Sequence, residues 1–130
     1  MEFINTIVAA IGGFAFGAVW YTVFANQWME ASGVEVVDGK PANQADPLPY
    51  IIGLAATIVV AGMMRHIFAG SGVDGIGRGL LYGAGLGLFI AAPWMITCYG
   101  FAARKKSLML IDAGYATGGA AVIGALLNAF

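Results

Sequence analysis

Apolar residues fill four long stretches of this chain, and the charged residues lie in the gaps between them. No Asp, Glu, Lys or Arg occurs between residues 3 and 29, 47 and 64, 79 and 103, or 113 and 130. A helix needs about 20 apolar residues to cross a hydrocarbon core of roughly 30 Å. The pattern therefore predicts an all-α polytopic membrane protein, a bundle of four transmembrane helices at about residues 3–24, 49–68, 79–101 and 108–127.

The spans leave room for one membrane domain, residues 1–130, with a single sizeable loop at residues 25–48. This loop is acidic, and its charged residues are Glu30, Glu35, Asp38, Lys40 and Asp46. Its first part, residues 27–32, is expected to continue as an interfacial helix, whereas residues 39–49 are rich in turn formers and should be irregular. In the third span, Pro93 predicts a kink or a lost backbone hydrogen bond.

Composition narrows the function classes. The 130 residues are 60% hydrophobic and only 10% charged, whereas a soluble domain carries about 25% charge. The net charge of −1 argues against a nucleic-acid partner. The sequence contains no catalytic triad, phosphate-binding loop or zinc-protease motif. His66 is not expected to bind a metal, because no second His, Cys or carboxylate lies at the spacing of a metal site. The sequence thus predicts a protein that is not an enzyme, with no catalytic residues, metal or cofactor.

The expected location of the protein is the bacterial inner membrane, with the lipid bilayer as one partner. Loop 1 (about residues 25–48) and loop 3 (the turn at residues 104–106) share one side and hold four basic residues, namely Lys40 and the cluster Arg104, Lys105 and Lys106. The other side holds only Arg65 and Arg78. The positive-inside rule then places loops 1 and 3 in the cytoplasm and both termini in the periplasm.

The 20 glycines are spaced as packing motifs. Small residues four positions apart let two membrane helices approach closely. They form a pair in the first span, a ridge in the third and a pair in the fourth: Gly13 and Gly17; Gly79, Gly83 and Gly87; Gly114 and Gly118. They predict either packing inside the bundle or an interface with a second copy or another membrane subunit.

Aromatic and polar residues gather in the half of the membrane next to loops 1 and 3. Asp112 is the one ionisable group among them and shares a helix face with Tyr115. The first hypothesis is a ligand or partner pocket formed by Trp20, Tyr21, Trp94, Tyr99, Asp112 and Tyr115. The alternative is an interfacial aromatic belt, with Asp112 paired to the basic turn at residues 104–106. In the opposite half, Asn5 and Asn128 are candidates for an interhelical hydrogen bond.

Two segments carry a family resemblance. Gly17-Ala18-Val19-Trp20-Tyr21, followed by Phe24 and Trp28-Met29, resembles the opening motif of the bacterial DUF1761 family. Leu110-Ile111-Asp112-Ala113-Gly114-Tyr115 is similar to the motif that begins the last helix of that family. The resemblance implies a small integral membrane protein and no particular activity.

The sequence leaves three functional hypotheses open. The first is an accessory or assembly subunit, or a homo-oligomeric scaffold, that acts through helix–helix contact. The second is a small transporter or channel protomer, with Pro93 as the gate and Asp112 as the coupling site. The third is a binder of lipid or another hydrophobic ligand, which would use the pocket around Asp112.

Overall fold

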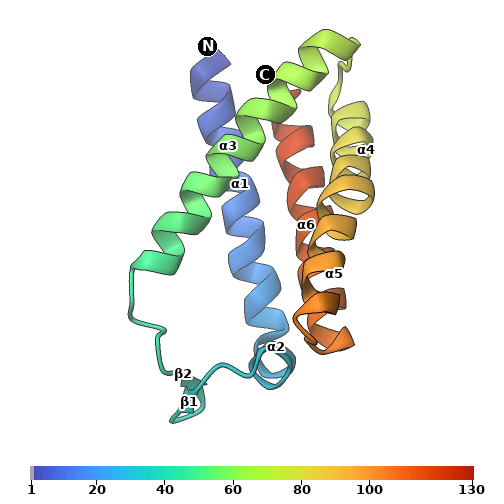
Figure 1. Ribbon diagram of the computed structural model, residues 1–130. Coiled ribbons are helices and arrows are strands. Elements are labelled where there is room, and N and C mark those ends of the chain that lie inside the picture. The colour runs from blue at the N-terminus through green and yellow to red at the C-terminus, as the bar shows by residue number, and fades with distance from the viewer. Residues whose placement is uncertain (1) are drawn as a thin grey trace.

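Long helices make up nearly all of the structure, a computed structural model that describes residues 2–130 (Figure 1). Within those residues, four helical spans are long and apolar enough to cross a membrane, which confirms the expected all-α membrane fold. The spans are α1 (Glu2–Val23), α3 (Leu48–Ser71), the continuous run α4 (Ile76–Leu86), η1 (Gly87–Ala91) and α5 (Ala92–Phe101), and α6 (Lys106–Leu127). The two termini lie at the same end of the bundle.

The connection between α1 and α3 is more ordered than its composition suggests. A short helix, α2 (Ala25–Ser32), follows α1 and matches the expected interfacial helix. The strands β1 (Val36–Val37) and β2 (Lys40–Pro41) then pair antiparallel, although residues 39–49 were expected to be irregular. Asp38 and Gly39 have φ of 53° and 75°, and an Asp-Gly pair with positive φ is a favoured two-residue hairpin turn.

Helix α6 is the centre of the bundle and contacts every other helix. Its closest neighbour is α4, because glycines let the two backbones meet. A Cβ atom added to Gly79 would lie 2.1 Å from the carbonyl oxygen of Gly124. A Cβ atom added to Gly83 would lie 2.2 Å from the carbonyl oxygen of Ala120. At Gly87 it would lie 2.4 Å from the carbonyl oxygen of Ala116. The glycine ridge of the third span is therefore used inside the chain.

The contact between α1 and α6 is different, because large side chains of each helix sit over glycines of the other. A Cβ atom at Gly114 would lie 2.5 Å from the Trp20 ring, and one at Gly118 2.4 Å from the Phe16 ring. In the other direction, Tyr115 packs over Gly17 and Ile123 over Gly13, at 2.6 and 2.7 Å from an added Cβ. All seven glycines expected in helix packing thus lie at close helix contacts of this chain.

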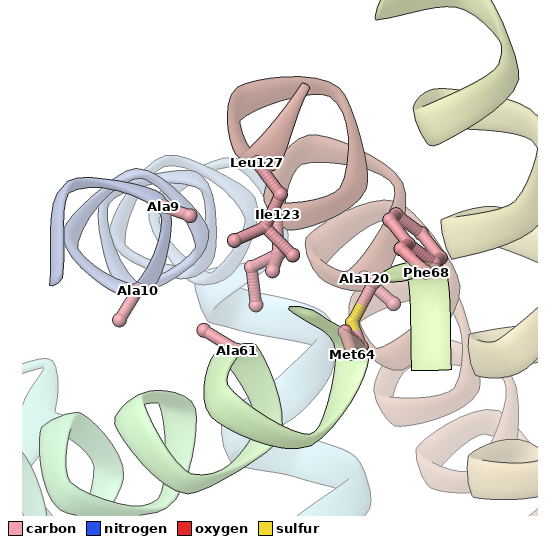
Figure 2. Close-up of a cluster of buried hydrophobic side chains, with 8 residues drawn as sticks. All are labelled: Ala9, Ala10, Ala61, Met64, Phe68, Ala120, Ile123 and Leu127. Carbon is pink, nitrogen blue, oxygen red and sulfur yellow. The ribbon is translucent and has the colours of Figure 1, made fainter. Parts of the chain in front are cut away.

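An apolar core joins α1, α3 and α6 toward the end of the bundle that holds the termini (Figure 2). Ala9 and Ala10 of α1 and Ala61 of α3 are fully buried, and Ile123 of α6 is 2% exposed. All three helices meet there, but α3 runs obliquely across α1 in Figure 1 and diverges toward its own start. The buried residues of α3 accordingly lie in its second half: Ala61, Met64 and Phe68.

The third span departs from regular α-helix just before Pro93. One turn before the proline, residues Gly87–Ala91 form the π-helical turn η1, in which the backbone N–H of Ala92 donates to the carbonyl oxygen of Gly87. Proline has no N–H to donate to the preceding turn, and a π-turn is one way in which a helix accommodates such a defect. The span remains helical through Pro93, and its irregularity takes the form of a widened turn just before the proline.

Candidate functional site

Asp112 is a buried acid held by two tyrosines. The residue is 8% exposed. The Tyr21 hydroxyl donates to Oδ1 at 2.5 Å, and the Tyr99 hydroxyl donates to Oδ2 at 2.7 Å. Both carboxylate oxygens therefore accept a hydrogen bond from a tyrosine hydroxyl. Because the three side chains come from α1, α5 and α6, the cluster ties three helices together near the loop 1 end of the bundle.

Local geometry brings these side chains together. A tight turn joins α5 to α6, in which Ala103 has φ of 56° and the Arg104 N–H donates to the Tyr99 carbonyl oxygen at 2.9 Å. Tyr99, at the end of α5, is thereby placed opposite the start of α6. The indole N–H of Trp20 donates to the Ile111 carbonyl oxygen at 2.9 Å, which fixes the end of α1 beside Asp112.

The basic turn does not pair with Asp112, so that part of the alternative prediction is wrong. Arg104 donates instead to the Ser32 carbonyl oxygen, and the Lys105 ammonium donates to the Glu30 carbonyl oxygen at 3.4 Å. Ser32 and Glu30 belong to the last turn of α2, whose carbonyl groups lack helical partners and attract cations. The basic turn therefore ties α2 to the start of α6.

A groove of about 700 Å³ opens beside Asp112. It lies between the second half of α1, helix α2, the segment after the hairpin and the start of α3, where α3 diverges from α1. Asp112 and Tyr115 of α6 line it together with Tyr21 of α1, Trp28 of α2 and Tyr50 of α3. The remaining lining is mostly apolar or uncharged: Phe14, Gly17, Ala18, Thr22, Ala25, Met29, Pro41, Asn43, Gln44 and Pro49.

Aromatic rings stand around the acid. The Tyr21 and Tyr115 rings meet edge to face with centroids 5.3 Å apart, and the Tyr21 and Trp28 rings do so at 6.2 Å. Phe16 stacks on Tyr115 behind them, at 6.4 Å. Among the residues that line the groove in the described chain, Asp112 is the only charged one.

The structure brings five of the six expected pocket residues together and leaves one outside. Tyr21, Tyr115 and Asp112 line the groove, Tyr99 holds Asp112, and Trp20 packs on Gly114. The expectation that Trp94 belongs to this set is wrong, because its side chain is 72% exposed and lies outside the groove. Tyr99 lies five positions after Trp94, so at 3.6 residues per turn the two side chains point about 140° apart.

A second polar cluster lies at the end of the bundle that holds the termini, and sequence reasoning missed its pairing. Asn5 is 2% exposed. It accepts from the Arg65 guanidinium and donates to the Leu126 carbonyl oxygen at 3.3 Å. The expected hydrogen bond between Asn5 and Asn128 is not formed. Asn128 donates instead to the Gly75 carbonyl oxygen at 3.1 Å. The available signal was that Asn5 and Arg65 fall at the same depth of neighbouring spans.

A family model described as a protein of unknown function, DUF1761, matches residues 4–128. No curated protein and no solved structure matches the chain.

Proposed function

The chain belongs to the DUF1761 family, and we propose that this member binds a lipid-like amphiphile in the groove beside Asp112. The carrying observation is that a buried acid stands in the wall of an otherwise uncharged groove. Asp112 is the seventh residue of α6, about 9 Å along the helix from Lys106 at 1.5 Å per residue. An ionisable residue at such a depth is costly in a membrane and usually serves a site.

The size and lining of the groove suit a ligand with an apolar chain and a small polar head. Ligand pockets usually measure about 300–1,000 Å³ and combine apolar walls with a few polar groups; at about 700 Å³ the groove falls within that range. Phe14 and Ala18 supply apolar wall on the α1 side. Asp112, Tyr21 and Tyr115 supply polar groups on the inner side.

The other two hypotheses have less support. The scaffold hypothesis rests on the small soluble fraction, the lack of reactive clusters and the glycine ridges, and these ridges contact other helices of the same chain. A transporter or channel needs polar groups at several depths. Here the cluster at Asp112 and the cluster at Asn5 are separated by an apolar core that includes Ala61 and Ile123. A membrane partner subunit, or a second copy, remains compatible with amphiphile binding.

For location, we propose the bacterial inner membrane with loops 1 and 3 in the cytoplasm. Single cysteines placed in a Cys98→Ala background test this in intact cells, using a membrane-impermeant maleimide. Cysteines at Asp38 and Lys106 should stay unlabelled until the cells are opened, whereas one at Asp74 should be labelled from outside. The reverse pattern would contradict the proposed orientation.

Ligand binding itself is testable through Trp28, which lines the groove. The protein is placed in lipid nanodiscs and titrated with dodecanol brominated at its terminal carbon, a neutral amphiphile whose bromine quenches tryptophan. The same titration on Trp28→Phe gives the quenching of the other tryptophans, which is subtracted. We expect a Trp28-dependent signal that saturates. A signal that rises linearly with the probe, or that vanishes in the subtraction, would refute binding in the groove.

A further inference from the structure

We propose that the groove selects amphiphiles with a positively charged amine head, and that Asp112 is the counter-charge for that head. This inference rests on the proposed function and adds the chemical class of the ligand. It starts from charge complementarity, because the groove contains one acidic side chain and no basic one among the residues that line it.

The arrangement around Asp112 fits an ammonium group. Tyr21, Tyr115 and Trp28 all line the groove, and their rings meet edge to face within 6.2 Å. Aromatic faces attract cations, and a set of such rings is a recurrent way to hold an ammonium group. A carboxylate beside the rings adds a full opposite charge in a poorly hydrated place. Apolar ligands need neither feature.

Asp112 retains capacity for a further donor. Each carboxylate oxygen has two lone pairs, and the hydroxyls of Tyr21 and Tyr99 use one on each oxygen. An ammonium N–H in the groove can therefore donate to Asp112 without displacing either tyrosine. An anionic head would instead face the carboxylate with no cation in the groove wall to offset the repulsion.

The charges outside the groove do not reverse this preference. Arg104 and Lys105 are directed to carbonyl oxygens of α2. Lys40 is exposed on the hairpin, and the same loop carries four acidic residues, Glu30, Glu35, Asp38 and Asp46. The loop that supplies Pro41, Asn43 and Gln44 to the groove lining is therefore acidic overall, which favours the approach of cations from that side.

The test compares three probes with the same brominated twelve-carbon chain, namely dodecylamine, dodecanol and dodecanoate. Binding is followed by Trp28-dependent quenching in nanodiscs made of lipids with no net charge. In the native protein we expect the amine to bind about tenfold or more tightly than the alcohol, as a charge-assisted hydrogen bond allows. The carboxylate should bind weakest.

Two variants separate the role of Asp112 from the effect of net charge. Asp112→Asn should abolish the preference for the amine over the alcohol. Glu35→Gln is the matched control, because Glu35 is an exposed acid outside the groove lining and its loss changes the net charge equally. It should keep the full preference.

The outcomes distinguish this inference from the proposed function. Equal binding of all three probes to the native protein, or a preference for the carboxylate, would overturn amine selection while leaving amphiphile binding in place. A preference lost equally in Glu35→Gln and Asp112→Asn would also overturn it. No Trp28-dependent binding of any probe would refute both proposals. If Asp112→Asn does not fold, the ranking of the three probes on the native protein decides.

Discussion

Replacing Gly83 by alanine should separate the two most closely packed helices of the bundle. The added Cβ would lie 2.2 Å from the Ala120 carbonyl oxygen, about 1.2 Å short of ordinary contact at 3.4 Å. The obstacle is backbone, so no rotamer change relieves it, and α4 must move away from α6. A gap approaching 1 Å removes a quarter to a half of the dispersion energy along a contact. Overpacking of this kind typically costs about 1–3 kcal/mol, and we expect about 2 kcal/mol here.

Gly85→Ala is the matched control for Gly83→Ala. Gly85 lies two residues away on α4, and an added Cβ meets nothing within 4 Å. There the substitution should stabilise by about 0.5–1 kcal/mol, because alanine is the better helix former. The assay is reversible unfolding in mixed micelles with increasing sodium dodecyl sulfate, followed by circular dichroism. Equal stability of the two variants would refute the close approach of α4 and α6.

Two further substitutions probe the polar clusters in the same unfolding assay. Tyr99→Phe removes one hydroxyl donor from Asp112 and should destabilise the protein by about 1 kcal/mol. The control Tyr82→Phe changes a residue that is 49% exposed and should alter stability little. Equal losses of stability in the two variants would contradict the structural role of Tyr99. Asn5→Ala removes the buried acceptor of the Arg65 guanidinium and should lower the free energy of unfolding by about 1–3 kcal/mol. A stability equal to that of the native protein would show that this cluster does not stabilise the bundle.

The spans were readable from the sequence because charge is so costly in a membrane that its absence alone marks the helices. The glycine ridge of α4 was equally readable, since Gly79 and Gly83 recur at helical spacing. Its partner was not foreseen. The surface of α6 that faces α4 is formed by Ala116, Ala120 and Gly124, whereas Gly114 and Gly118 of α6 face α1. Small residues lie on several faces of α6, and spacing alone does not say which neighbour meets which face.

The site could be predicted only in part from the sequence, for a related reason. Asp112 stood out as the one acid within the last span, and Tyr21 and Tyr99 were assigned to its half of the membrane by counting along the helices. Depth is fixed by that count, but direction around a helix axis depends on packing. Trp94 was therefore misplaced. The groove was not predictable either, because it arises from the divergence of α3 from α1, a tertiary feature without a local sequence signal.

The central claim, an amphiphile bound beside Asp112, is tested most directly by filling the groove. Ala18 lines the groove, whereas Ala15 is an exposed residue of α1 outside the groove lining. Ala18→Phe and Ala15→Phe therefore add the same ring inside the site and outside it. Saturable quenching of Trp28 by the brominated dodecylamine should persist in Ala15→Phe and be lost in Ala18→Phe. Identical saturation curves for both variants and the native protein would contradict the account.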